Sequence, residues 1–245
     1  KVLFPDTQLK AMGVGVPEYA ISDLDVSGSL GGPIIKDKLW FFGNARYLFN
    51  SFTSPFRPAT IAGKVFEPAP DMDHTEMMGF GKLTAQLSSN LKFMGMFNYT
   101  DIYEPYFKLD KGWNVAAEAM RRWDHEKGYT GNAVITWLLN PNTFLDLRAG
   151  YVRRYFPVPL QPDAVSNSQN IDGSTTYAWG SARFNETYLR KRFQASAYVT
   201  RFQDNFLGGS HEFKAGMEFE DAYGDWNWWR ANSMLWNYWN NDPYW

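Results

Sequence analysis

The sequence predicts an all-β fold: an antiparallel transmembrane β-barrel with short periplasmic turns and long extracellular loops. Four times, two runs of alternating apolar and polar residues flank a tight turn, and a long polar loop separates each pair from the next. Short turns at one end and long loops at the other are typical of a membrane barrel. We therefore expect residues 1–245 to form one domain, a partial outer-membrane barrel of about eight strands.

The composition permits a protein that crosses a membrane with strands. The mean hydropathy is −0.44, and no apolar run approaches the roughly 18 residues of a spanning helix. A spanning strand needs only about 10 residues, of which every second one is apolar. The 24 Lys and Arg residues nearly balance the 26 Asp and Glu residues, so we expect no nucleic-acid partner. The chain has no Cys, which excludes disulfide bonds and thiolate metal sites.

The first two hairpins show the alternation most clearly. In the run 24–34, apolar residues such as Leu24 share one face, and Asp25 lies on the other. A turn at 36–38 joins this run to the next, and a turn at 88–90 joins the second pair of runs. This period of two residues is the signature of strands with one apolar face.

The last two hairpins turn at 140–142 and at 208–210. In the run 145–151, Leu145 and Leu147 share one face, while charged residues occupy the other. The expected strands are 24–34, 39–49, 77–87, 91–99, 129–137, 145–151, 193–199 and 213–219.

Charged residues fall almost entirely on one phase of these strands. An Arg or Lys on a lipid-facing phase would cost about 2–4 kcal/mol at mid-membrane, so the charged phase is expected to face a polar lumen. Arg148, Arg153 and Arg154 form a basic group that either steers an anionic substrate or joins Asp146 in a structural network. The residues expected to carry lumen charge are Asp146, Arg148, Arg154, Glu218 and Glu220.

A soluble β-sandwich shows the same alternation with its faces exchanged, and three features favour the membrane barrel. The strands are longer than the usual 5–6 residues or so of soluble sheets. Their apolar faces are rich in Gly and Ala, which leave voids in a packed core. The long connections 50–73, 101–124, 157–190 and 225–245 exceed the length that is usual for structureless loops in compact domains.

The segment 31–43 carries a specific resemblance. It reads Gly-Gly-Pro-Ile-Ile-Lys-Asp-Lys-Leu-Trp-Phe-Phe-Gly and resembles a hairpin near the start of the barrel in TonB-dependent outer-membrane receptors of the large Oar-like subgroup, which carry a carboxypeptidase-regulatory-like domain. Trp40 is the one departure from the family's pattern. The segment 209–219, with His211, Phe213 and Lys214, is similar to a later strand of that family.

The resemblance implies a barrel of about 22 strands closed around a plug, in the outer membrane of a bacterium. Both ends of the chain read as interior to a longer polypeptide, so we expect the plug, the TonB-box and the remaining strands to lie outside this chain. Contact with the TonB complex is then made by those other segments, and outer-membrane lipid surrounds the barrel.

An aromatic run near the carboxyl end is the strongest candidate for recognition. Interleaved Trp, Tyr and Asn side chains suit stacking on a ligand, suit a protein interface, and equally suit packing between loops over a barrel mouth. We expect this run to stand in an outer loop. The candidate contact residues are Trp226, Trp228, Trp229, Trp236, Tyr238 and Trp239.

No other pattern points to chemistry. The chain lacks a nucleophile elbow, a zinc-protease helix motif and a phosphate loop, so we expect no enzyme activity and no cofactor. His74, His125 and His211 each lie beside a turn or loop and too far apart in sequence for a metal pair, so we predict no metal site.

The leading expectation is an energy-coupled outer-membrane receptor that takes up a scarce or bulky ligand, with the ligand open among carbohydrate, peptide and siderophore. The alternative is a structural barrel that anchors a cell-envelope assembly through a protein partner. A soluble sugar-binding β-sandwich is the third reading.

Overall fold

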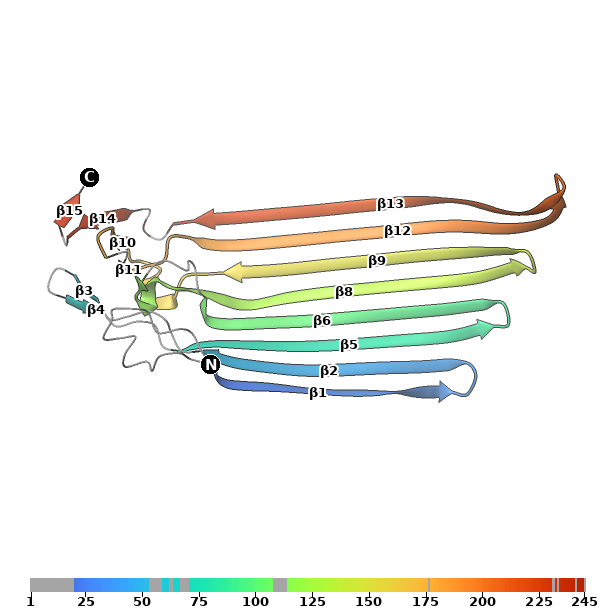
Figure 1. Cartoon of the computed structure of the whole chain (residues 1–245), viewed down its shortest axis with the longest axis horizontal. Helices are drawn as coiled ribbons and strands as arrows, with labels where there is room; N and C mark the ends of the chain where they lie inside the picture. The colour runs from blue at the N-terminus through green and yellow to red at the C-terminus, as the bar shows by residue number, and fades with distance from the viewer. Residues whose placement is uncertain are drawn as a thin grey trace, which may run out of the picture.

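The computed structural model describes residues 20–52, 59–61, 64–66, 71–107, 114–175, 177–230, 232, 234–240 and 242–244. The fold is all-β, and eight long strands form one antiparallel sheet in the order β1-β2-β5-β6-β8-β9-β12-β13 (Figure 1). No helix in the described part of the chain has the length and apolarity that crossing a membrane requires. The strands are β1 (Ala20–Ile35), β2 (Leu39–Phe52), β5 (Met72–Ser88), β6 (Leu91–Phe107), β8 (Arg121–Asn140), β9 (Thr143–Val158), β12 (Asn185–Phe206) and β13 (Gly209–Trp229).

Each long strand pairs with its neighbour along the chain, and the four tight turns lie together at one end of the sheet (Figure 1). Polar side chains hold these turns. Asp37 adopts a positive φ of 60° in the first, Ser88 donates to Asn90 Oδ1 at 2.7 Å in the second, and Asn140 Oδ1 accepts from the Asn142 amide at 3.1 Å in the third. In the fourth turn, Gly208 adopts a positive φ of 83°, a conformation that glycine takes without strain.

All eight predicted strands are confirmed, but they are longer than the sequence indicates. The strand β12 covers 185–206 where 193–199 was expected, and β13 reaches Trp229. The extensions carry charged and aromatic residues on both faces, and these side chains do not interrupt the backbone ladder. The boundaries of the long loops were therefore wrong, because the strands continue past the point where the apolar alternation stops.

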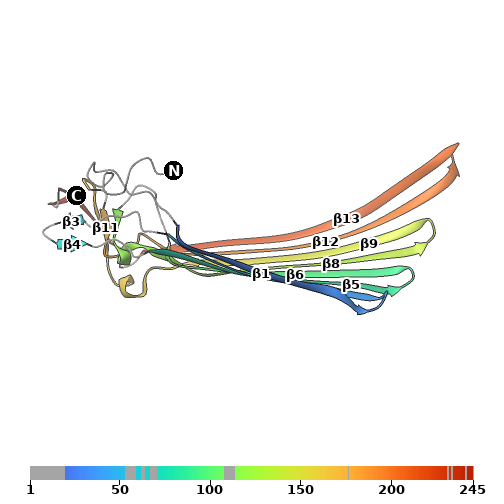
Figure 2. The same ribbon diagram turned by 60° about the horizontal axis from the view of Figure 1, so that its bottom comes forward.

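The sheet is open and twisted (Figure 2). Within the described residues, β1 and β13 lie at its two edges, and each pairs on one side only. The eight strands therefore do not close on themselves in this structure.

The segments between the hairpins are not structureless at the loop end. A second sheet, in the order β15-β14-β10-β11-β7, combines pieces of three of the predicted loops, and β3 and β4 form a small hairpin. Short 3₁₀ turns, η1 (Ala117–Ala119) and η2 (Pro162–Ala164), complete this region. The strands are β3 (Ala59–Ile61), β4 (Lys64–Phe66), β7 (Asn114–Val115), β10 (Gln169–Asp172), β11 (Tyr177–Trp179), β14 (Leu235–Trp239) and β15 (Asp242–Tyr244).

Buried apolar residues of the described chain gather mainly in this loop-end region, which we call the cap (residues 114–120, 158–175, 177–182, 234–240 and 242–244). Met120 and Ala178 share one cluster, and Ala116 packs on Tyr177, which has no exposed surface. The carboxylate of Asp172 is also buried and accepts from the Ser174 and Thr175 amides at 3.0 and 2.9 Å. Most of the long sheet has no such core, since its two faces are largely uncovered.

Replacing Gly180 by alanine is expected to loosen the cap. Gly180 has a φ of 85°, and a Cβ there would lie 2.5 Å from the Ser168 carbonyl oxygen, so the backbone has to shift. We expect a local loss of about 1–2 kcal/mol, measured as faster hydrogen exchange of the β10 and β11 amides. Gly224→Ala is the matched control, because a Cβ there meets nothing within 4 Å; equal exchange in both variants would contradict the prediction.

Candidate functional site

The two faces of the long sheet differ in chemistry. Register pairs place Phe41, Leu83, Gly95 and Ala133 in one row across four neighbouring strands, all on the same face. We call the apolar zone on this face the apolar belt. Its large side chains are Leu24, Val26, Leu30, Leu39, Phe41, Tyr47, Phe49, Met77, Leu83, Leu87, Leu91, Phe93, Phe97, Ile135, Trp137, Leu145, Leu147, Tyr151, Phe193, Val199, Phe213, Met217 and Phe219.

The apolar belt crosses the strands obliquely. Its middle runs from Ala45 on β2 to Ala215 on β13. The register row of Ala45 meets β13 at Tyr223, which lies about 27 Å along the strand from Ala215, while six strand spacings across the sheet amount to about 29 Å. The belt is therefore inclined to the register rows by about 40°.

The same inclination appears in the charges that end the belt on the loop side. Relative to the register rows, the first charged residue on this face moves toward the turn end of the sheet in two steps of two residues between β6 and β13: Asp101 and Lys127 share one row, Arg153 and Lys191 share the next, and Asp221 lies one step further. On β2 the belt runs from Leu39 to Phe49, about 34 Å along the strand, which projects to a height of about 26 Å across the inclined belt. The limiting residues, in strand order, are Asp101, Lys127, Arg153, Lys191 and Asp221.

Tyrosines and basic residues lie side by side along this limit. The rings of Tyr99 and Tyr129 lie 5.4 Å apart, and the Arg153 guanidinium lies 6.0 Å from the Tyr129 ring centroid. The Lys191 ammonium lies 5.8 Å from the ring of Tyr223. Such pairs combine an apolar ring with a basic side chain whose charged end extends away from the apolar surface.

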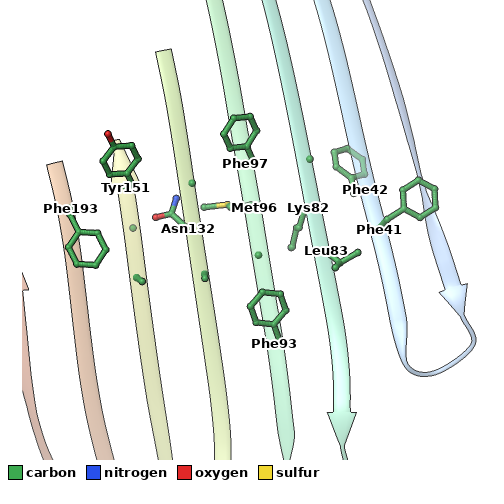
Figure 3. A pocket seen from close by; sticks show the side chains of 16 residues that line it. Phe41, Phe42, Lys82, Leu83, Phe93, Met96, Phe97, Asn132, Tyr151 and Phe193 are labelled. Carbon is green, nitrogen blue, oxygen red and sulfur yellow. The ribbon is translucent and has the colours of Figure 1, made fainter. Parts of the chain in front are cut away.

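The middle of the apolar belt is hollowed. Glycine and alanine positions on adjacent strands floor a depression of about 730 Å³. Figure 3 shows Phe93 and Phe97 from β6, Tyr151 from β9 and Phe193 from β12 around it. The hollow is lined almost entirely by apolar surface, so it offers few groups that could fix the orientation of a bound molecule.

The opposite face carries cross-strand ion pairs, and we call it the charged face. Arg46 donates to both oxygens of Asp25, at 2.7 and 2.5 Å. Arg192 donates to Glu220 at 2.6 Å, and Gln194 donates to the same carboxylate oxygen at 2.9 Å.

All five residues predicted to carry lumen charge lie on this face. Asp146 accepts a hydrogen bond from Thr136 at 2.8 Å, and Arg148 lies 4.0 Å from it. Glu218 accepts from Tyr198. Arg154 is paired with Glu126, and Glu220 with Arg192.

Arg153 does not belong to this group, so grouping it with Arg148 and Arg154 was wrong. Successive residues of a strand point to opposite faces, which puts Arg153 at the limit of the apolar belt. Arg154 and Arg148 remain together on the charged face.

Near the loop end of the charged face, aromatic rings form a row across five strands. The rings of Phe107 and Trp123 lie 4.9 Å apart, and Trp123 lies 4.6 Å from Phe156. Phe156 stacks on Tyr188 at 5.4 Å, and Tyr188 stacks on Trp226 at 5.8 Å with planes 6° apart. We call these five residues the aromatic row; only Trp226 was predicted from sequence.

A cavity of about 350 Å³ opens on the aromatic row. Its lining combines three rings of the row, Trp123, Phe156 and Tyr188, with Arg154, Arg190 and Glu126. The carboxylate of Glu126 is 2% exposed and pairs with Arg154 through Oε1, while its Oε2 has no hydrogen-bond partner within the described residues. The Trp123 indole nitrogen is likewise buried and unpartnered there.

The predicted aromatic contact residues separate into two groups. Trp226, Trp228 and Trp229 lie on β13 opposite Tyr188, Glu186 and Asn185. Placing them in an outer loop was therefore wrong, because aromatic residues favour strands and β12 offers a partner for each of them.

The other three, Trp236, Tyr238 and Trp239, lie on β14 within the cap. Tyr238 packs its ring 5.0 Å from Trp179, and its hydroxyl lies 3.4 Å from Asn170 Oδ1. Trp239 is more than half exposed.

No metal cluster appears among the described residues, where no three His, Cys, Asp or Glu side chains lie close enough to hold an ion. His74 contacts Glu104 at 2.6 Å, and His125 contacts Asp101 at 3.0 Å. His211 stacks near Phe213. Each histidine thus has a local partner on its own sheet.

Comparison with known proteins adds no relative. No protein-family model, curated protein or solved structure matches this chain. Function is therefore inferred from the geometry of the two faces.

Proposed function

We propose that the long sheet is a sector of an outer-membrane barrel, and that the protein is a TonB-dependent receptor that takes up a scarce or bulky ligand. The observation that carries the proposal is the inclined apolar belt. Strands of membrane barrels tilt by about 35–45°, and their outer face bears an apolar band about 25 Å tall. The belt's inclination of about 40° agrees with the first value, and its height on β2, about 26 Å, agrees with the second.

The tyrosines and basic residues at the loop-side limit of the belt support the same proposal. Aromatic girdles mark both borders of a barrel's apolar band, and basic side chains beside them extend toward the headgroups. Trp137, near the turn end of β8, lies at the opposite border of the belt. A buried face of a soluble sandwich has no need for such borders.

The charged face is then the lumen wall. Its ion pairs link neighbouring strands, as Arg46 with Asp25 and Arg192 with Glu220 do, and these groups need water or a polar filling. In lipid, the unpaired edges of β1 and β13 are not tolerated, so further strands complete the wall. The cap stands on the outer side, and the four tight turns lie in the periplasm.

The test uses cells that express the full-length protein. An epitope inserted between residues 163 and 168 of the cap is expected to be labelled on intact cells, whereas one inserted at the 208–210 turn requires a permeabilised outer membrane. The protein is expected in the outer-membrane fraction, with a folded band that shifts on boiling. Recovery in the soluble fraction, or labelling of both epitopes on intact cells, would rule the proposal out.

A second candidate is a structural barrel that anchors an envelope assembly. It is favoured by the exposed aromatic side chains Trp228, Trp229 and Trp239 at the loop end, which are 53%, 47% and 56% exposed and resemble the anchors of protein interfaces. Collapsing the proton gradient distinguishes the two functions. Ligand accumulation by an energy-coupled receptor stops, whereas a partner held by an anchor stays bound.

A further inference from the structure

We infer that the cavity on the aromatic row binds an acidic saccharide, a sugar ring that bears a carboxylate. The inference rests on the proposed function, because it names the class of ligand that would bind at the extracellular end of the same lumen wall. The lining is three aromatic rings, two guanidinium groups and one buried carboxylate. Each of these three kinds of side chain can contact one part of such a ligand: its ring, its carboxylate or its hydroxyl groups.

The guanidinium groups call for an anion. Arg154 and Arg190 are direct register partners on β9 and β12, and like charges in facing positions destabilise a sheet. Glu126 neutralises only Arg154, and Arg190 has no ion pair within 4 Å among the described residues. The cavity therefore keeps an excess positive charge beside Arg190, where a planar carboxylate can accept two hydrogen bonds.

The buried carboxylate favours a ligand that can donate a hydrogen bond. Among the described residues, the Oε2 atom of Glu126 is shielded from water and has no hydrogen-bond partner, which is an unfavourable state for a buried polar group. A ligand hydroxyl that donates to this oxygen relieves that state, once the side chains that cover Oε2 shift to admit it. A purely anionic ligand without hydroxyl groups cannot do so.

The aromatic rings call for a flat apolar surface. Trp123, Phe156 and Tyr188 line the cavity side by side, and Trp226 continues the row beyond it. Sites of this kind combine ring contacts with a few fixed polar groups. A sugar ring offers C–H surface on one face and hydroxyls at its rim, and a row across several strands suits a chain of such rings.

The test is calorimetric titration of the full-length protein in detergent micelles with hexagalacturonate, and with its methyl ester as the uncharged probe. We expect saturable binding of the acid that weakens as salt is added, and at least about tenfold weaker binding of the ester, because a hydrogen bond to a charged group is lost. Equal binding of acid and ester, or no binding of the acid, would overturn the inference.

Two variant pairs localise the site. Arg190→Gln is expected to weaken binding of the acid about tenfold, whereas Lys191→Gln, the neighbour on the opposite face, changes it less than about twofold. Tyr188→Ala is expected to weaken binding, and Tyr188→Phe to retain it. Equal effects of Arg190→Gln and Lys191→Gln would indicate general attraction to a basic surface and contradict the site.

Failure of this inference is distinguishable from failure of the proposed function. A protein that resides in the outer membrane with its cap outward but does not bind the acid contradicts the ligand class alone. A protein that fractionates as soluble contradicts the outer-membrane proposal whether or not it binds the saccharide.

Discussion

Arginine placed at Ala45, Ala133 or Ala215 is expected to destabilise the folded protein by a similar amount, about 2–4 kcal/mol in each case. The three alanines lie on β2, β8 and β13, and in register terms Ala45 and Ala215 are about 27 Å apart along the strands. An inclined belt nevertheless puts all three at its middle, where a charge is most costly. The measurement is urea unfolding of the protein folded into lipid vesicles.

The control substitutions lie on the opposite face or outside the belt. Asn98→Arg, on the charged face of β6, is expected to cost less than about 1 kcal/mol, and so is Tyr223→Arg, which shares the register row of Ala45 but lies beyond the belt. Thicker bilayers should increase the penalties for the alanine variants. Near-zero penalties at Ala45 and Ala215 alongside a large one at Ala133 would mean that the apolar zone is not an inclined membrane belt.

The strands could be predicted from sequence because their signals are local. Alternation with a period of two, closed by turns such as 36–38 and 140–142, depends only on neighbouring residues. Strand ends could not be predicted, since the apolar signal stops where the belt stops while the backbone ladder continues. On β12 the belt ends at Phe193, but pairing continues to Asn185.

The fold of the cap could not be predicted from local sequence patterns. Its central pairing joins β10 to β14 in parallel, with Gln169 beside Leu235, and no local pattern announces a contact between segments so far apart in the chain. Its strands are also short; β7 has two residues and β11 has three. Polar sequence with scattered aromatic residues reads as loop when no alternation is long enough to count.

The aromatic row was missed for a related reason. Phe156, Tyr188 and Trp226 each follow the charged phase of their strands toward the loops, which is a weak signal taken one strand at a time. Only the register between the strands brings them into contact. Trp123 reaches the row after an irregularity at His125, whose φ is 57°, and sequence alternation alone would put it on the wrong face.

Removing the guanidinium of Arg154 is expected to destabilise the folded protein, because its partner Glu126 is buried. Breaking a fully buried ion pair costs about 3–5 kcal/mol, because it leaves one buried charge without a partner. Glu126 is 2% exposed, while the Arg154 side chain is 57% exposed and its loss is partly met by water. We therefore expect Arg154→Ala to lower the free energy of unfolding by about 2–3 kcal/mol, measured by urea titration in micelles.

Two further variants separate the cost of leaving the Glu126 carboxylate unpaired from the cost of losing the other contacts of Arg154. If the buried carboxylate causes the penalty, Glu126→Gln combined with Arg154→Ala restores most of the stability, since an amide is far less costly to bury than a carboxylate. Arg46→Ala is the matched control: its pair with Asp25 is also cross-strand and on the same face, but exposed, and such pairs contribute less than about 1 kcal/mol. Equal losses for Arg154→Ala and Arg46→Ala, or no recovery in the double variant, would show that burial of Glu126 is not what makes this pair costly to break.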